Sequence, residues 1–362
     1  MAMTRATTPT RATTTTSNRG TATVSRVTAD RCPLGDSRTA TDGGTGADSG
    51  VTREWAAGDT TGSGDLTQNP AVVAVLPEQQ WRARAAAHRA RFDELAGPYL
   101  ARRAAGESHP VIDFLFTYYG QKPAQLRRWH PGFGIALAGA REYEGARGYH
   151  RVDRDVHTAD PAFLDRRRDT VRFVADLLRA TASRSPHLSC FGLHEWAMVY
   201  RTDEVRHQQV PLRLGTAGTD EVVESMSLRC THFDAFRFFT PEAVGRNAAP
   251  LTRDEQIATE QPGCLHANMD LYKWCFKLLP LVDSDLLLDC FALACAARDL
   301  DMRASPYDLS DYGYEPIRIE TPSGRSEYVR NQLAVTERAG VLRGRLLEVC
   351  ERLLDRSAAD RA

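Results

Sequence analysis

The chain has almost no lysine, no long apolar run and no excess of one charge. Three of its 46 basic residues are lysines and the others are arginines, a bias that we ascribe to a GC-rich genome. No stretch of about 20 apolar residues occurs, and the N-terminus lacks the apolar core of a signal peptide, so we expect neither a membrane span nor secretion. With a net charge of −1, contact with nucleic acid or an anionic membrane would need a local patch.

Paired cysteines of the zinc-ribbon type are missing as well. The eight cysteines are scattered and form no CxxC pair, so we expect reduced thiols and a cytoplasmic protein. The remaining composition is that of a globular protein. Hydrophobic residues make up 42% of the chain and charged residues 26%, which is enough apolar material for a packed core.

The composition changes near residue 70. Residues 1–70 are rich in Thr, Ala, Gly and Ser and hold few large apolar side chains. Such a segment cannot offset its ordering entropy, so we predict a disordered leader, or an upstream extension created by a misassigned start codon. For residues 71–362 we predict a single mainly helical domain with at most a few short strands.

Apolar residues recur at helical spacing in eight segments of this domain. We expect the helix at Asp220 to be capped by Thr219 and the last helix to be interrupted near Gly340. A short strand is expected at Val210–Leu214, and a strand or an extended arm at Ile317–Thr321. The predicted helices are Trp81–Tyr99, Ile112–Tyr119, Pro161–Thr181, Leu193–Tyr200, Asp220–Leu228, Leu265–Leu279, Ser284–Arg298 and Glu327–Leu354.

Side chains that can do chemistry are concentrated in four short runs beside the most apolar helices. The runs are Cys190–Trp196, Cys230–Asp234, Cys264–Asp270 and Asp299–Arg303. Three of them have a cysteine, then a histidine, then a carboxylate. Within the third run, His266 and Asp270 are four residues apart and would share one helix face. An imidazole and a carboxylate could therefore converge there on a water, a base or an ion.

Several interpretations of these runs stay open. The histidines could be hydrogen-bonded core residues, with the cysteines as small apolar fillers. If they met in space beside a carboxylate, they would suit Zn or non-haem Fe, and that set would be His194, His232 and His266. A carboxylate in apolar surroundings would suit general acid or base work, and the candidates are Glu195, Asp234 and Asp270.

Aromatic and basic residues add two further options. Eight aromatic side chains could stack on a planar ring, although such residues more often fill a core. They are Trp196, Phe236, Phe238, Phe239, Trp274, Tyr307, Tyr312 and Tyr314. Two neighbouring arginines, Arg127 and Arg128, could bind phosphate or form a solvated face.

Six segments together resemble a known family. They are His109–Tyr119, Pro123–Gly132, Cys190–Tyr200, Cys230–Pro241, Gln261–Lys273, and Leu300–Leu309 followed by Ile319–Pro322. The sequence resembles a bacterial family labelled 3-methyladenine DNA glycosylase over almost all of the chain after about Trp81. We interpret Pro131–Gly134 as an ordinary turn, because the chain lacks a convincing helix-hairpin-helix of the kind found in other glycosylases.

The resemblance implies hydrolysis of the N-glycosidic bond of an alkylated purine in DNA, without a cofactor. The base would be extruded and stacked between aromatic rings, while a carboxylate stabilises the sugar cation and orients a water. On this reading the carboxylate is Glu195, Asp234 or Asp270, and the orienting partners are His194, His232 and His266. Stacking would come from Trp196, Trp274 and Tyr312, and phosphate binding from Arg127 and Arg128.

Two alternatives from other classes remain. The same histidines and carboxylates could bind Zn or Fe in a helical oxidase or hydrolase that acts on a small molecule. The chain could also be a noncatalytic domain that binds a ligand or DNA. The choice depends on whether the four runs meet in space.

Overall fold

The computed structural model describes residues 74–202 and 209–359. Within them, twelve α-helices and one four-stranded sheet make up a mainly helical fold, as the sequence predicts. The predicted leader 1–70 lies outside the described residues. The description of residues 71–362 as one domain stays a prediction. No helix in the described ranges has both the length and the apolar character needed to cross a membrane.

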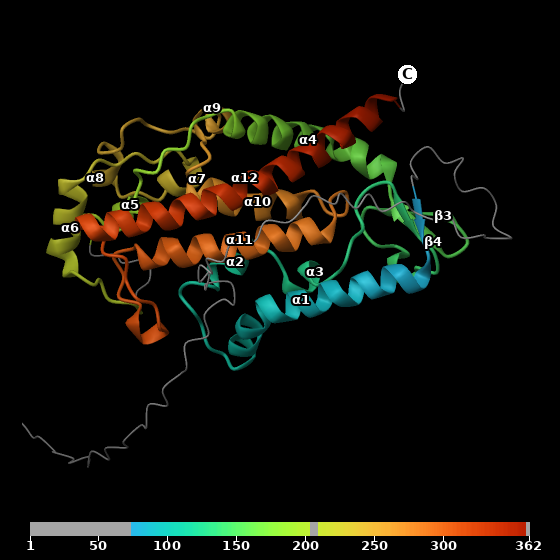
Figure 1. Cartoon of the computed structure of the whole chain (residues 1–362), viewed down its shortest axis with the longest axis horizontal. Helices are drawn as coiled ribbons and strands as arrows, with labels where there is room; N and C mark the ends of the chain where they lie inside the picture. The colour runs from blue at the N-terminus through green and yellow to red at the C-terminus, as the bar shows by residue number, and fades with distance from the viewer. Residues whose placement is uncertain (1–73, 203–208, 360–362) are drawn as a thin grey trace, which may run out of the picture.

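Three long helices form the centre of the molecule. They are α10 (Leu265–Lys277), α11 (Ser284–Arg303) and α12 (Pro322–Ala359), which lie side by side with α4 (Pro161–Ala182) along α12 and α1 (Glu78–Ala104) beside α11 (Figure 1). α11 is apolar nearly all round and is buried, as predicted. Its first turn is capped by Asp283, whose side chain accepts a hydrogen bond from the backbone N–H of Leu286 at 2.8 Å.

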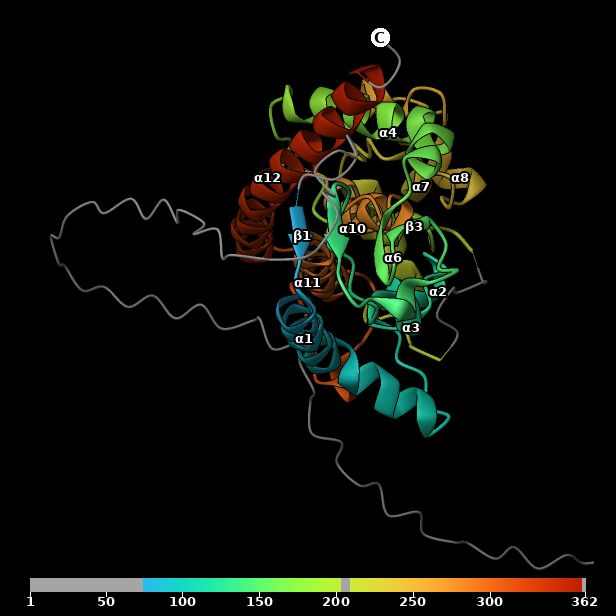
Figure 2. The same ribbon diagram turned by 90° about the vertical axis from the view of Figure 1, so that its right-hand side faces the viewer.

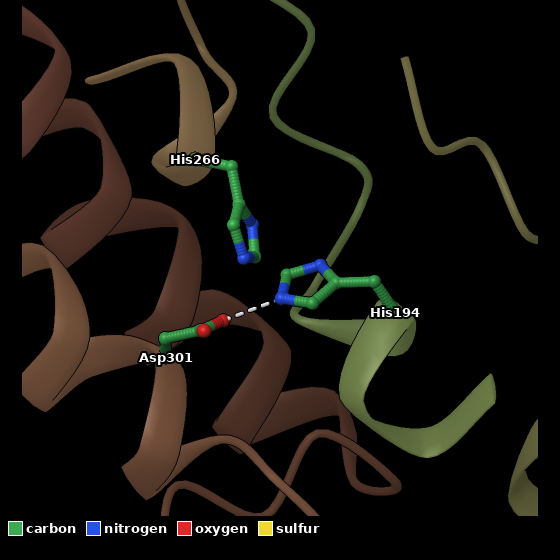
Figure 3. A group of neighbouring side chains, drawn as sticks. All are labelled: His194, His266 and Asp301. Carbon is green, nitrogen blue, oxygen red and sulfur yellow. Dashed lines mark hydrogen bonds and ion pairs between the residues drawn. The ribbon is translucent and has the colours of Figure 1, made fainter. Parts of the chain in front are cut away.

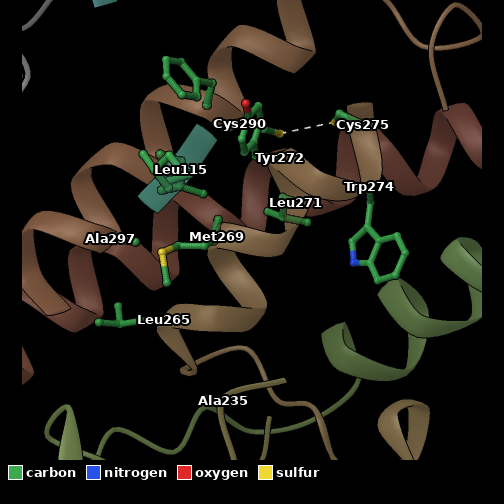
Figure 4. Close-up of a cluster of buried hydrophobic side chains, with 14 of the residues drawn as sticks. Leu115, Ala235, Leu265, Met269, Leu271, Tyr272, Trp274, Cys275, Cys290 and Ala297 are labelled. Atoms are coloured by element: carbon green, nitrogen blue, oxygen red, sulfur yellow. Dashed lines mark hydrogen bonds between the residues drawn. The ribbon is translucent and has the colours of Figure 1, made fainter. Parts of the chain in front are cut away.

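The main core fills the space between α10 and α11. Met269, Leu271 and Cys275 of α10 pack with Cys290 and Ala297 of α11, and all five are buried (Figure 4). Each large apolar side chain buried here stabilises the fold by about 1.5–3 kcal/mol. This packing fixes α10 and α11 relative to each other, and both helices carry polar residues at their ends nearest the candidate site.

A small sheet lies at one end of the molecule, away from the short helices that carry the polar runs (Figure 1). Its strands are β1 (Ala74–Leu76), β2 (Ile135–Leu137), β3 (Tyr149–Asp153) and β4 (Val156–Ala159), in the order β1-β2-β4-β3. β1 and β2 are parallel and the other pairs are antiparallel. The strands have only three to five residues each, so no long alternating pattern reveals them.

The remaining elements are short. Figure 2, in which the molecule is rotated by 90°, shows α6, α7 and α8 on the side of the bundle away from α12. The full set of short helices in the described ranges is α2 (Phe114–Thr117), α3 (Pro123–Leu126), α5 (Leu193–Ala197), α6 (Gly215–Ser225), α7 (Phe233–Phe236), α8 (Pro241–Val244) and α9 (Gln256–Thr259). Two 3₁₀ turns are η2 (Arg141–Tyr143) and η3 (Ser310–Tyr312).

Both strand predictions outside the sheet are wrong. Val210–Leu214 contributes only an isolated bridge between Leu212 and Tyr307, and Ile317–Thr321 contains no strand. A few β-branched and apolar residues do not make a strand without a partner that completes their backbone hydrogen bonds.

The predicted helix cap at Thr219 and the predicted interruption of the last helix near Gly340 are wrong as well. α6 begins at Gly215, so Thr219 lies inside it, where its hydroxyl donates to the Gly215 carbonyl at 2.7 Å. α12 runs through Gly340 without a break. Gly340 is exposed, and a glycine inside an exposed helix face lowers stability without ending the helix.

The Pro131–Gly134 segment connects α3 to β2. Because a strand follows it, the segment is not the hairpin of a helix-hairpin-helix. Gly132 has a positive φ of 89°, and the next backbone N–H, of Phe133, donates to the Leu281 carbonyl at 3.0 Å. The turn therefore ties the sheet to the segment between α10 and α11.

Candidate functional site

The four polar runs meet where α5, α7, α10 and α11 come together. The ring centroids of His194 and His266 are 4.5 Å apart, and those of His232 and His266 are 5.4 Å apart. All three histidines are buried. Asp301, from the fourth run, lies against His194. Side chains separated by more than 100 residues therefore form one continuous polar cluster inside the apolar core.

A tight turn before α5 directs the first run inward. Phe191 and Gly192 both have positive φ, 51° and 71°. A Cβ on Gly192 would lie 3.3 Å from the Cβ of Ala304, just beyond the end of α11, so the turn approaches that helix closely. The indole N–H of Trp196 donates to the Ala304 carbonyl at 2.8 Å. These contacts fix α5 so that the two residues His194 and Glu195 point toward α10 and α11.

The first group of charges is His194, Glu195, Arg298 and Asp301. His194 Nε2 lies 2.7 Å from Asp301 Oδ1 (Figure 3). Arg298 Nη1 donates to Glu195 at 2.7 Å and to the second oxygen of Asp301 at 3.1 Å. Burial alone would lower the pKa of His194, but the charge and hydrogen bond of Asp301 raise it well above its usual range. We therefore describe His194 and Asp301 as an ion pair.

Nδ1 of the His266 ring is buried without a hydrogen-bond partner in the described part of the chain, and so is Nδ1 of His232. Figure 3 shows the His266 ring directed toward the contact between His194 and Asp301. Burial, followed by the nearby charge of His194, holds the pKa of His266 well below its usual range. The cluster thus contains one neutral imidazole whose nitrogen lone pair is available to a ligand.

The second group is His232, Glu260, Asp270 and Lys273. His232 Nε2 lies 3.2 Å from Asp270 Oδ2 and 3.4 Å from Glu260 Oε1. The Lys273 ammonium contacts the same oxygen of Asp270, and Tyr119 donates its hydroxyl to the other oxygen at 3.0 Å. Burial would raise the pKa of Asp270, but Lys273 and His232 lower it far below its usual range. Asp270 is therefore a fully partnered carboxylate.

Asp234 lies at the edge of the second group, with three cations around it. Arg253, Arg237 and Lys273 approach its carboxylate to 2.7, 3.3 and 3.5 Å. Burial opposes the ionised form, but these cations, first of all Lys273, lower the pKa of Asp234. Its side chain is 14% exposed, compared with 2% for Asp270. Asp234 is therefore the ionised carboxylate that lies nearer to solvent.

A cavity of about 200 Å³ opens beside both groups. We call it the aromatic cavity, because three rings contribute to its wall. Two carboxylates, one guanidinium and the neutral His266 are its polar members. The lining residues are Phe114, Tyr118, Glu195, Met198, Asp234, Ala235, Phe238, His266 and Arg298.

The predicted polar residues divide between the wall of the aromatic cavity and the layer behind it. Glu195, Asp234 and His266 line the cavity. His194, His232 and Asp270 do not, and instead hold the lining residues through the contacts described above. The sequence could not distinguish the two sets, because it shows which residues share a helix face and not which face meets a cavity.

The three stacking residues that the resemblance implies lie elsewhere. Trp196 is fully buried under α11, and Trp274 packs edge-on against Phe173. Tyr312 contacts His109 in a separate apolar cluster. They fill space between elements, which is the common role of large aromatic side chains. The rings that line the cavity are Phe114, Tyr118 and Phe238, and of these only Phe238 is among the aromatic residues that the sequence suggests for stacking.

The two arginines predicted to bind phosphate, Arg127 and Arg128, differ from each other in their contacts. Arg127 forms a bidentate pair with Asp93, with contacts of 2.8 and 2.7 Å. Arg128 has no such partner among the described residues and lines a second cavity, formed with α4 and the end of α10.

Sequence reasoning missed Glu260, Lys273 and Arg298. Lys273 carried a signal, since it is one of three lysines and lies seven residues after His266, on nearly the same helix face. Arg298 carried another, because it directly follows the apolar run Phe291–Ala297 and needs a partner if it is buried with that run. No local pattern indicates Glu260, which reaches the site from the end of α9.

Two trios have a donor set and spacing that could hold a metal ion. His194, His266 and Asp301 form one, His232, Glu260 and Asp270 the other, and within each the ligand atoms lie within 4.8 Å of one another. The predicted trio of three histidines is divided between them. In each trio a cation already contacts the aspartate, Lys273 in the case of Asp270 and Arg298 in the case of Asp301.

Comparison with protein-family models, with curated proteins and with solved structures finds no match in any of the three. The resemblance to 3-methyladenine DNA glycosylases therefore depends on the sequence motifs alone, and function has to be argued from the geometry of the site.

Proposed function

We propose that this chain hydrolyses the N-glycosidic bond of an alkylated purine in DNA, with the extruded base held in the aromatic cavity. The observation that carries the proposal is the lining of that cavity, in which aromatic rings and two carboxylates surround one small space. The motifs that resemble the glycosylase family agree with it, because four of the six matching segments contribute lining residues.

The size and chemistry of the cavity fit a single planar cation. Its volume of about 200 Å³ is below the roughly 300–1,000 Å³ of pockets for drug-sized ligands, so one ring system fits better than a whole nucleotide. The rings of Phe114 and Tyr118 are stacked with centroids 4.7 Å apart, and Tyr118 meets Phe238 edge-on. Aromatic faces attract cations, and an alkylated purine is cationic.

The charges of the lining are held in place by partners. Glu195 pairs with Arg298, and Asp234 lies among Arg237, Arg253 and Lys273, while His266 is held neutral. The pairing of Arg298 with Glu195 and Asp301 fixes these groups before any ligand arrives. A fixed arrangement of charges stabilises developing charge without further reorganisation.

The two lining carboxylates, Glu195 and Asp234, lie at different depths in the cavity, and we assign their roles from this difference. Glu195 is 6% exposed and Asp234 is 14% exposed. A base that enters from solvent places its ring deepest and leaves its sugar near the mouth. We therefore assign Glu195 to the positively charged base and Asp234 to the sugar cation and the attacking water.

In the proposed step, the bond between C1′ of the sugar and the purine nitrogen breaks. Its electron pair stays on the purine, which leaves as a neutral base. The oxygen of a water bonds to C1′, and the water's proton passes to the Asp234 carboxylate and then to solvent. Asp234 stays ionised until that moment because Lys273 and the nearby arginines lower its pKa.

The test is release of 3-methyladenine from methylated DNA, measured chromatographically beside a known glycosylase. We expect Asp234→Asn to lower the rate constant by about 100-fold or more, the range of a positioned acid or base. Glu195→Gln should mainly raise the substrate concentration needed for half-maximal rate. Asp254→Asn, a nearby exposed change, serves as the matched control. No release by the wild-type chain, under conditions where the reference enzyme is active, would refute the proposal.

A second candidate function is metal-dependent hydrolysis or oxidation of a small molecule. It is favoured by the unpartnered Nδ1 of His266, which lies in a trio with His194 and Asp301. Cys190 Sγ lies 3.7 Å from the outer nitrogen of His194, and Arg298 bonds the outer oxygen of Asp301, an arrangement found around metal ligands. A Zn or Fe ion held there would activate a water.

The two candidates differ in metal content. Protein purified without chelator should contain stoichiometric Zn or Fe if the second is right, and His266→Gln should abolish it. His232→Gln removes a histidine of the other trio and should leave the metal in place. Metal-free wild-type protein that gains no thermal stability from added Zn or Fe(II) would exclude the second candidate.

A further inference from the structure

A second cavity collects positive charge far from the aromatic cavity. Its volume is about 330 Å³, and it lies between the first turns of α4, the end of α10 and the loop before β3. Four cationic side chains line it, those of Arg128, Arg147, Arg167 and Lys277, and no Asp or Glu is among its lining residues. We call it the arginine cavity.

These four cations have no carboxylate partner within the described ranges. Several other arginines at the surface are in ion pairs, as Arg127 is with Asp93 at 2.7 Å. Arg167 donates one hydrogen bond, to the Lys277 carbonyl at 2.5 Å, and its Nε is buried without a partner. Arg128 donates to the Glu142 carbonyl at 3.0 Å. The backbone thus orients these guanidinium groups but does not neutralise them.

Like charges held together without a partner repel each other. The pKa of Arg167 is lowered by burial and then by the charge of Arg147, and that of Lys277 is lowered by burial and by Lys273. An anion that enters the cavity would relieve this repulsion and bond the free guanidinium donors. Phosphate suits arginine because its oxygens accept two parallel N–H bonds.

The arginine cavity and the aromatic cavity each include a residue from the same face of α10. His266, Asp270, Lys273 and Lys277 lie at positions i, i+4, i+7 and i+11 of this helix, and residues with that spacing line up along one side. His266 belongs to the aromatic cavity and Lys277 to the arginine cavity. Eleven residues at a rise of 1.5 Å place the two about 16 Å apart.

We propose that the arginine cavity binds a phosphate group, and that in the working protein this is a backbone phosphate of the nucleic acid strand whose base occupies the aromatic cavity. The anion site itself follows from the four unpaired cations. Its assignment to nucleic acid rests on the proposed function, and a free phosphorylated small molecule would offer the same chemistry.

The first experiment measures binding of a fluorescent 20-nucleotide single strand over a range of salt concentrations. We expect Arg128→Gln, Arg147→Gln and Arg167→Gln each to weaken binding and to make the plot of log K against log salt shallower by about 0.7, the value for one lost phosphate contact. Arg127→Gln removes the same charge from the adjacent, ion-paired position and should leave the slope unchanged. Equal slopes in all four variants would overturn the proposal.

The second experiment separates the sources of phosphate. Binding of pyrophosphate is measured by calorimetry with the wild-type chain and the same variants. If pyrophosphate binds, the cavity variants weaken it and the oligonucleotide does not bind, the anion site stands and the DNA assignment fails. If neither probe binds, or the cavity variants bind both probes as the wild type does, the anion site is refuted. Release of 3-methyladenine by a variant that has lost phosphate binding would show that the two proposals are separable.

Discussion

At the scale of single residues, a small number of buried ion pairs keep the side chains of the site in place. Arg298 is fully buried and bonds both Glu195 and Asp301. Burial would lower its pKa, but those carboxylates raise it, so it stays charged. A buried ion pair adds little net stability, yet removal of one partner leaves a charge without compensation. Arg298 is therefore the residue whose loss should do most damage to the site.

We expect Arg298→Met to lower the free energy of unfolding by about 3–5 kcal/mol in urea titrations at neutral pH, because Glu195 would lose its charged partner. Arg345→Met is the control, since Arg345 pairs with Asp289 at 2.7 Å at a site where its side chain is 45% exposed. Loss of this exposed ion pair should lower the free energy of unfolding by about 0–1 kcal/mol. If the double change Arg298→Met with Glu195→Gln recovers none of the lost stability, the unpaired charge is not the cause.

His130 gives a prediction for pH. Its Nδ1 lies 2.9 Å from the Tyr149 hydroxyl, and burial, with the charge of Arg128, lowers its pKa to about 3. The unfolded chain binds a proton at His130 below pH 6.5, whereas the folded chain does so only near pH 3. Folding stability from this residue is therefore complete above pH 6.5 and falls as the pH falls, by about 2 kcal/mol at pH 5.

The measurement compares unfolding free energies at pH 7 and pH 5. The wild-type chain should lose about 2 kcal/mol more between these values than His130→Gln does. His187→Gln removes an exposed histidine and should follow the wild-type curve. An unchanged loss in His130→Gln would show that other groups dominate acid destabilisation.

The sequence predicted the identity of the site residues better than their roles. His194, His232, His266 and the carboxylates near them do gather, because runs beside the most apolar helices are drawn into the core with those helices. What separates a lining residue such as Glu195 from a supporting one such as Asp270 is the position of a cavity. That position depends on how α5, α7 and α10 pack, and no local pattern records it.

At the scale of elements, the long helices were predictable and the short ones were not. α4, α10 and α11 begin at the predicted residues Pro161, Leu265 and Ser284, because strong apolar periodicity starts there. α7, α8 and α9 have four residues each, too few to show a period. Their positions follow from tertiary contacts, as do those of the short strands.

α12 offers a test of how glycine acts within a single helix. A Cβ on Gly340 would meet nothing within 4 Å, whereas a Cβ on Gly324 would lie 1.9 Å from the Arg318 carbonyl oxygen. We expect Gly340→Ala to raise the free energy of unfolding by about 0.5–1 kcal/mol, because alanine loses less backbone entropy. Gly324→Ala should lower it by about 1–3 kcal/mol through steric overlap. Thermal unfolding of both variants checks this, and a shift in the same direction would contradict it.

At the scale of the whole molecule, charge is distributed unevenly although the net charge is −1. The aromatic cavity has ion-paired carboxylates beside aromatic rings, and the arginine cavity has four cations and suits an anion. α10 contributes a residue to each, and its ends carry His266 and Lys277. An alkylated nucleotide within a strand presents both charges, a cationic base and anionic phosphates. A small neutral substrate would use neither feature of this arrangement.

The distance between the cavities makes the joint proposal testable by substrate length. About 16 Å along α10 corresponds to about five nucleotides at roughly 3.4 Å per nucleotide. A ten-nucleotide strand with its methylated base at one end can reach the arginine cavity, whereas the same base at the other end directs the strand away from it. We expect Arg167→Gln to weaken binding of only one of these two strands, and to leave a three-nucleotide substrate unaffected. A loss that does not depend on where the base lies would show that Arg167 acts through the general charge of the surface, and the two cavities would then not share a strand.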